Sequence, residues 1–397
     1  MTGKKILVTD GEQRAALAVV RSLGGAGHRI YVSSTRGRSL AGASRFAESE
    51  FAVPDAITDS RRFAEAIVTL ARQQKIDVLL PITDASLLAL LPERARLPGV
   101  CLPFAEADAQ RAISDKKRLL EVATSVGIAI PEQRVVPSPA SWRDMDLESL
   151  RFPIVLKPSR SVAERDGARV KLSVRHAGGV AQLQERLNEL DASAYPLLVQ
   201  QRIVGAGIGI FLLLWNDTLL AVFAHRRIRE KPPAGGVSVY RESIAADPAL
   251  VLASRTLLER FEWRGVAMIE YKEDAASGTP YLMEINGRFW GSLQLAIDSG
   301  VDFPALLIGA AMGDRPDPVR DYRVGERSRW WWGDTDHLIA RMRHSATALA
   351  LPPGAPSRIG ALRDFLTLWR PGDRNEILRL RDPMPFVFET SEWLQGR

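Results

Sequence analysis

Short apolar runs alternate with amphipathic segments from Lys5 to about residue 105. The runs include KILV, RIYVSS and IDVLLPITD, which have the length and composition of buried strands, and the segments between them have the apolar spacing of helices. Strands that alternate with helices pair in parallel and form a sheet with helices on both faces. Residues 1–110 are therefore predicted to form a Rossmann-like α/β domain.

The first strand-to-helix turn of this domain reads TDGEQR. It lacks the G-x-G-x-x-G spacing that lets a backbone approach a pyrophosphate. A dinucleotide-binding oxidoreductase is therefore disfavoured.

The composition restricts the class of protein further. One cysteine excludes an internal disulfide framework, and five histidines without ligand-like clustering make a zinc site unexpected. No apolar run reaches the length of a membrane span, so no membrane partner is expected, and a cytoplasmic location fits best. The net charge of +6 is spread over scattered arginines, which favours an anionic small substrate over nucleic acid.

The pattern changes from alternating strands and helices to hairpins beyond this first domain. The run GIGIFLLLWNDTLLAVFAHRRI is predicted to form a hairpin that turns at Asn216 and Asp217. Residues 111–315 are predicted to form an α+β domain with antiparallel sheets. Residues 316–397 contain WWWG and the helical stretch DTDHLIARMRHSATALAL, and are predicted to be a mainly helical C-terminal extension whose aromatic residues are buried.

Two strands near the end of the second region bring acidic residues together. Alternation along YLMEINGR places Glu284 and Asn286 on one face. The opposite, packing face is predicted to carry Tyr281, Met283 and Ile285. The strand GVAMIEYKED precedes it across the short loop AASGTP, so antiparallel pairing brings Glu270 opposite Glu284 and Asn286. Two carboxylates and an amide oxygen form a hard oxygen site that suits Mg²⁺, with Mn²⁺ as an alternative.

Basic residues complete this predicted site. Arg288 follows on the face that carries the acidic residues, where it can meet phosphate oxygens. Lys157 ends an apolar strand before a proline, so its ammonium group projects from a rigid strand end. Lys116 stands in the first turn of a helix for which Ser114 is the predicted cap, and a cation there opposes the helix dipole and needs another reason to be present.

The order of these motifs resembles the ATP-grasp superfamily, specifically its carbamoyl-phosphate-synthase-like branch, over roughly residues 1–315. The resemblance implies a Rossmann-like domain followed by two α+β subdomains that hold ATP between antiparallel sheets. It assigns contacts with ATP to Lys116 and Lys157, and to Gln200, Gln201, Arg202 and Ile203 at the adenine hinge. It assigns Mg²⁺ to Glu270, Glu284 and Asn286, and the transferred phosphoryl group to Arg288.

The sequence departs from the family pattern at several positions. The loop after the second lysine reads PSRSVAERDG, with Gly167 as its one glycine where the family's loop is glycine-rich, so closure over phosphate is expected to rely on the serine–arginine–serine run that begins at Ser159. The hinge position that is often glutamate is Gln201, and Gly287 stands where proline is common.

The resemblance implies an ATP- and Mg²⁺-dependent ligase that activates a carboxylate as an acyl phosphate and joins it to an amine, forming ADP and phosphate. The alternatives are a phosphotransferase or carbamoyl-phosphate-synthase-like enzyme on the same fold, and a non-catalytic nucleotide-binding protein. The expected partners are small-molecule carboxylate and amine substrates, and a homodimer is compatible with the sequence.

Three basic residues keep open roles. His225 and Arg227 in FAHRRIRE are expected at a partly exposed basic strand end, with binding of phosphate or of a substrate carboxylate as the alternative. Arg241 in VYRES has the same two interpretations.

Overall fold

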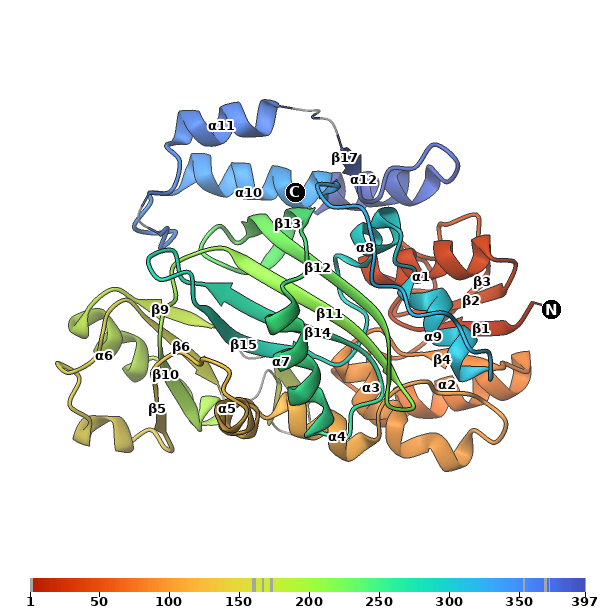
Figure 1. Cartoon of the computed structure of the whole chain (residues 1–397), viewed down its shortest axis with the longest axis horizontal. Helices are drawn as coiled ribbons and strands as arrows, with labels where there is room; N and C mark the ends of the chain where they lie inside the picture. The colour runs from red at the N-terminus through yellow and green to blue at the C-terminus, as the bar shows by residue number, and fades with distance from the viewer. Residues whose placement is uncertain are drawn as a thin grey trace.

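The computed structural model describes residues 3–158, 162–165, 168–171, 174–352, 354–367, 370 and 372–396, with the backbone alone for 162–165 and 168–171. Figure 1 shows a large central sheet with the N-terminal domain on one side of it and a smaller sheet on the other. Helices of the C-terminal region lie along one edge of this assembly.

The N-terminal domain contains a parallel sheet with strand order β3-β2-β1-β4. Ile6, Leu7 and Val8 of β1 are fully buried, as expected for a parallel strand covered on both faces. The predicted doubly wound α/β arrangement is confirmed. Its elements are β1 (Lys5–Val8), α1 (Arg14–Gly25), β2 (Arg29–Ser34), β3 (Ala47–Ala52), α2 (Ser60–Gln74), β4 (Val78–Leu80), α3 (Asp84–Leu90), and the 3-10 helix η1 (Leu91–Arg96). Helices α4 (Ala107–Ser114) and α5 (Lys116–Ser125) follow.

A small antiparallel sheet with strand order β5-β10-β6-β9 comes next. Its apolar residues, among them Leu156 and Val199, form a cluster of their own with Leu183 of α6. The elements of this region are β5 (Gln133–Val136), η2 (Ser141–Asp144), β6 (Ile154–Pro158), β7 (Val162–Arg165), β8 (Ala168–Lys171), β9 (Arg175–Ala177), α6 (Val180–Asn188), η3 (Ala192–Ala194) and β10 (Leu197–Gln201).

The large sheet has strand order β15-β14-β11-β12-β13-β16-β17. The hairpin between β11 and β12 turns at Asn216 and Asp217, whose φ angles of 46° and 62° are those of a type I′ turn, so this prediction is confirmed. The elements here are β11 (Gly207–Trp215), β12 (Thr218–Lys231), β13 (Val237–Ser243), α7 (Pro248–Glu259), β14 (Gly265–Glu273), β15 (Pro280–Asn286), α8 (Leu293–Ser299) and α9 (Phe303–Ala311).

The two faces of the large sheet pack against different partners. Phe211 and Met268 belong to the same buried cluster as the N-terminal domain and helices α8 and α9. Leu212 and Ile269, which point the other way, pack with α4, α5 and α7. Among the described helices none is long and apolar enough to span a membrane, and α8 and α9 reach that length only as a pair bent by 89°.

The C-terminal region is helical as predicted and also extends the sheet, but the helical stretch that was predicted to reach residue 351 ends at Arg343. Its elements are β16 (Arg327–Arg329), α10 (Trp331–Arg343), α11 (Arg358–Leu366), β17 (Asp373–Asn375) and α12 (Met384–Gln395). Strand β16 pairs with β13, and β17 pairs with β16. Its aromatic residues pack together but are half-buried, less than predicted, with the Trp332 ring stacked on that of Trp393 at a centroid distance of 4.0 Å. The region is therefore part of the main sheet as well as a helical layer.

A buried glutamate just after β17 joins this region to the rest of the molecule. Glu376 accepts hydrogen bonds from Arg14 of α1 and from Arg241 of β13, each at 2.6 Å. Arg241 is completely buried, so the expectation of a partly exposed strand end was wrong for it, because residues more than a hundred positions later cover that strand. Burial alone would raise the pKa of Glu376, but Arg14 and Arg241 outweigh it and lower that pKa.

We expect Glu376→Ala to lower the free energy of unfolding by about 3–5 kcal/mol, because it leaves two buried guanidinium groups without their counter-charge. Urea denaturation measures the change. The matched control is Glu392→Ala in α12, whose carboxylate pairs with the exposed Arg36 and should contribute less than about 1 kcal/mol. Equal effects of the two substitutions would contradict a structural role for the buried bridge.

Candidate active site

Two neighbouring strands bring the predicted acidic residues together. In the register of β14 and β15, Glu270 lies opposite Glu284, and Met268 lies opposite Asn286. The side-chain amide of Asn286 donates to Oε1 of Glu284 at 3.1 Å. The predicted pairing of the strands is confirmed, and these groups share the sheet face that looks toward the N-terminal domain.

A β-bulge changes the packing face of β15. The register shifts after Glu270, so that Tyr271 lies opposite Leu282. Leu282 and Ile285 are consequently the residues buried in the core, and Met283 is half-buried. The prediction that Tyr281 and Met283 pack beside Ile285 was therefore wrong, because the bulge interrupts strict alternation. The bulge does not affect the pairing of Glu284 with Glu270, which precedes the register shift.

Arg227 reaches Glu270 from β12 by crossing the intervening strand β11. Its Nη2 donates to Oε2 of Glu270 at 2.5 Å, and its Nη1 donates to Oε1 of Glu230 at 2.8 Å. The crossing passes over Gly207, where a Cβ atom would lie 2.8 Å from Cδ of Arg227. Arg227 is only 9% exposed, so its placement at an exposed strand end was wrong. The glycines at alternate positions in GAGIGI were the sequence signal for this crossing.

His225 is also buried, which corrects its expected exposure. Its ring meets that of Phe211 edge to face at a centroid distance of 4.8 Å. Neither ring nitrogen has a hydrogen-bond partner within the part of the chain that the structure describes. Burial, reinforced by the charge of Arg227, lowers the pKa of His225 well below its usual value. A neutral, enclosed imidazole is suited to packing and not to binding an anion.

The surroundings separate the proton affinities of the two glutamates. Burial raises the pKa of Glu270, Arg227 opposes this rise, and the charge of Glu284 adds to it. Burial would also raise the pKa of Glu284, but the charges of Lys116 and Lys157 and the hydrogen bond from Asn286 together lower it. Glu284 is therefore the more firmly ionised carboxylate of the pair.

Lys157 faces this pair from the end of β6. Burial and then the charge of Lys116 lower the pKa of its ammonium group to about 8, while Glu284 and Glu270 act in the opposite direction. Lys157 is thus still mainly protonated at pH 7, but it lacks a close anion of its own among the described residues.

Lys116 begins α5, although the helix is capped differently from the prediction. The carboxylate of Asp115 accepts from the backbone amides of Lys117 and Arg118 and is the N-cap. Ser114 instead ends the preceding helix, where its hydroxyl donates to the carbonyl of Gln110 at 2.8 Å. The predicted cap was wrong by one residue because two helices meet here without a loop between them.

Arg288 is held between the acidic pair and the N-terminal domain. Its Nε donates to Oδ2 of Asp84 at 2.8 Å, and its Nη2 donates to Oδ1 of Asn286 at 2.9 Å. Asp84 is the first residue of α3, which is the next element after strand β4. Sequence reasoning missed Asp84, although side chains that follow the carboxyl end of a parallel strand commonly line a site.

The predicted hinge residues lie at the end of β10 and just beyond it. The side chain of Gln200 donates to that of Gln133 at 3.1 Å, and the amides of Gln201 and Arg202 donate to backbone carbonyls of the same small sheet region. Ile203 is buried. Ser159 lies outside the described residues.

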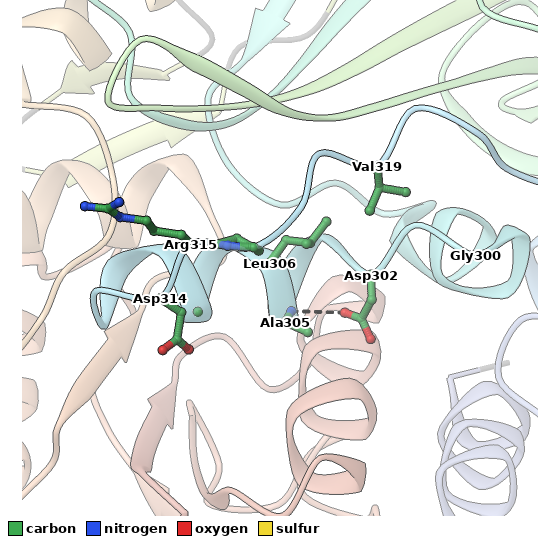
Figure 2. Close-up of a pocket in the computed structure, with 9 residues that line it drawn as sticks. Gly300, Asp302, Ala305, Leu306, Asp314, Arg315 and Val319 are labelled. Carbon is green, nitrogen blue, oxygen red and sulfur yellow. Dashed lines mark hydrogen bonds between the residues drawn. The ribbon is translucent and has the colours of Figure 1, made fainter. Parts of the chain in front are cut away.

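A cavity of about 420 Å³ lies away from this site, beside α9 (Figure 2). The carboxylate of Asp302, at the edge of this cavity, accepts hydrogen bonds from the amide of Ala305 and from the hydroxyl of Ser22. Figure 2 shows the guanidinium group of Arg315 directed away from Asp302. None of its lining residues comes from β14 or β15. It is therefore separate from the candidate site.

Comparison with known proteins gives one family and a set of similar structures. Residues 193–329 match the model of a family described as ATP-grasp in the biosynthetic pathway with Ter operon. No curated protein sequence matches this chain.

The similar solved structures include three bacterial enzymes. L-amino acid ligase from Bacillus licheniformis is 15% identical with a TM-score of 0.61, over 80% of this chain and 76% of that one. N5-carboxyaminoimidazole synthetase from Staphylococcus aureus, complexed with ADP, is 14% identical with a TM-score of 0.63, over 82% of this chain and 81% of that one. Biotin carboxylase from Campylobacter jejuni is 14% identical with a TM-score of 0.63, over 82% of this chain and 74% of that one. These likenesses show a shared fold.

We expect Gly207→Ala to destabilise the protein by about 1–3 kcal/mol, because the new methyl group would displace an arginine that two carboxylates hold in place. In a double-mutant cycle with Arg227→Ala, most of that cost should disappear. Gly25→Ala is the control, since a Cβ there meets no atom within 4 Å. Strictly additive effects at positions 207 and 227 would show that the glycine has another purpose.

Proposed function

We propose that this chain, an ATP-grasp protein by fold, is an ATP- and Mg²⁺-dependent ligase that activates a carboxylate as an acyl phosphate and joins it to an amine. The observation that carries the proposal is the pairing of Glu270 with Glu284 beneath cationic side chains from three other parts of the chain. The similar structures include enzymes named as a ligase and a synthetase.

The chemistry of the donors fits a hard divalent cation. Glu270 and Glu284 would hold Mg²⁺ or Mn²⁺ through carboxylate oxygens, leaving the other positions to phosphate and water. Asn286 now presents its amide nitrogen to Glu284 and its oxygen to Arg288. It would therefore become a ligand only after its side-chain amide rotates so that the oxygen faces the cation. When bound, the cation would neutralise charge on the phosphates of ATP.

The cationic side chains would hold the nucleotide. Lys157 and Lys116 would contact phosphate oxygens, and the segment from Gln200 to Ile203 would lie against adenine. Arg288, already fixed by Asp84, would meet the γ-phosphoryl group, where its charge stabilises the transfer. Ser159 keeps its predicted part in closing over phosphate. Arg227 is a positioning residue, because it holds the Glu270 carboxylate in place and opposes the rise in its pKa that burial causes.

The proposed reaction needs no nucleophile from the protein. A carboxylate oxygen of the substrate attacks the γ-phosphorus of ATP, the bond to the β-phosphate oxygen breaks, and ADP leaves. The nitrogen of the amine then attacks the acyl phosphate, and inorganic phosphate leaves as the amide forms. A phosphotransferase or carbamoyl-phosphate-synthase-like enzyme would share the first step. The cytoplasm, which supplies ATP, is the proposed location, and the homodimer stays a prediction.

Glu284→Gln should reduce Mg²⁺-dependent release of ADP by at least about a hundredfold, because it removes one of two carboxylates from the proposed metal site. Circular dichroism should show an unchanged fold, since Glu284 is outside the buried cores. Glu273→Gln is the control and should release ADP at the normal rate, because this half-buried residue at the end of β14 pairs with Arg226 and lies outside the proposed metal site. A folded Glu284→Gln protein with full activity would remove these residues from the site.

Nucleotide affinity should decrease as the pH rises above about 8, because Lys157 then loses the proton that attracts phosphate. If bound phosphate returns this pKa to its ordinary value near 10.4, the affinity falls about tenfold between pH 7 and pH 9. Titration calorimetry at several pH values measures this. Lys157→Met should bind the nucleotide more weakly, and its affinity should no longer depend on pH. A wild-type affinity that is constant over this pH range would contradict the assignment of Lys157 to phosphate.

The reaction itself can be tested by trapping the acyl phosphate with hydroxylamine. Enzyme, Mg²⁺, ATP and a panel of amino acids and other carboxylic acids should give ADP and a hydroxamate together for at least one acid. A stable phosphorylated product without hydroxamate would identify a phosphotransferase instead. Nucleotide binding without any ADP release across the panel would favour the non-catalytic alternative.

A further inference from the structure

A second cavity, of about 630 Å³, lies between the small sheet and the C-terminal region. One wall comes from β9, α6 and the residues just after β10. The other comes from the end of α10 and the described residues of segment 341–358. In Figure 1 this is the place where α10 and α11 pass above β9. None of the residues proposed to hold the metal or the phosphates of ATP lines it.

Three arginines line this cavity, and each is held by a backbone carbonyl. Arg202 donates to the carbonyl of Ala234 at 3.0 Å, and Arg358 donates to that of His344 at 3.0 Å. Arg341, which is 5% exposed, donates to the carbonyl of Pro356. Across the described residues, none of the three arginines forms an ion pair with a carboxylate. The three guanidinium groups are thus held in place without a paired carboxylate, although the charge of Glu230 acts on Arg202 and opposes the lowering of its pKa by burial.

The other described lining residues leave the positive charge of the arginines unopposed. No aspartate or glutamate is among the described residues that line it. His176 is neutral at pH 7, because burial and then the charge of Arg202 lower its pKa to about 4. The amide group of Gln182 uses its oxygen to accept from the amide of Gly178, which leaves its nitrogen as a donor. Ser357 caps α11, so the amino end of that helix also faces this region.

We propose that this cavity binds a small polyanion with two or more phosphate or carboxylate groups, at a second site that adjoins that of the nucleotide at Arg202. The volume lies within the range of small-molecule sites. Guanidinium groups bind phosphate and carboxylate in a bidentate manner, and three of them fixed around one cavity suit a ligand with several anionic groups. Because Arg202 belongs to the predicted adenine hinge and also lines this cavity, the polyanion would join the C-terminal region to the hinge. This proposal does not depend on ligase activity.

Calorimetry on the full chain tests the proposal, with pyrophosphate in one arm and citrate in the other at a constant concentration of free Mg²⁺. The titrations are made with the nucleotide site saturated by a non-hydrolysable ATP analogue. At least one probe should bind at one site, and comparison of the arms shows whether phosphate or carboxylate is preferred. Arg341→Gln and Arg358→Gln should each weaken binding at least tenfold, whereas Arg343→Gln, which is exposed and outside the cavity, should change it less than twofold.

Arg358 is exposed, so its substitution keeps the test valid if Arg341→Gln impairs folding. The pKa of His176, followed by NMR, should also rise when the probe binds, because a nearby anion stabilises the imidazolium form. Failure of both probes to bind would overturn the proposal. Binding that the nucleotide analogue abolishes, or that neither arginine substitution weakens, would overturn it equally.

Discussion

Two carboxylates lie side by side on neighbouring strands of the central sheet, and their mutual repulsion determines what must surround them. Arg227 crosses a strand to pair with Glu270, and Lys157 and Lys116 approach Glu284 from the small sheet and from α5. These cations come from three separate stretches of the chain. The large sheet, the small sheet and helix α5 therefore meet around this acidic pair.

Near the other edge of the large sheet, the C-terminal region supplies a buried anion between cations. Arg14 and Arg241 are buried cations from the N-terminal domain and the large sheet, and Glu376 supplies the anion for both. The guanidinium group of Arg14 also lies over the ring of Trp330, with its Cζ atom 3.9 Å from the ring centroid. A region that lies beyond the resemblance to the ATP-grasp family is thus part of the interface that holds the two larger units together.

Local patterns were sufficient to predict the class of fold and the pairing of Glu270 with Glu284, because alternation and a short loop determine which residues of a hairpin face each other. The burial of Arg227 was not predictable from its own strand, since it depends on Gly207 in the neighbouring strand and on a carboxylate one strand further. The bulge near Met283 likewise arises from the fit between strands and not from the composition of either one. Tertiary partners distant in sequence decide such features.

The balance of charge around the acidic pair also explains why the site suits a nucleotide in complex with a cation. Lys116 and Lys157 carry no close carboxylate partner at the site, whereas Arg288 is already paired with Asp84. The two lysines are therefore the charges left to attract phosphate, while Arg288 is held in a fixed direction. A cation bound by the carboxylates would relieve their repulsion, and the phosphates would relieve that between the lysines. Each component alone leaves an unbalanced charge, so binding of the cation and of the nucleotide should favour one another.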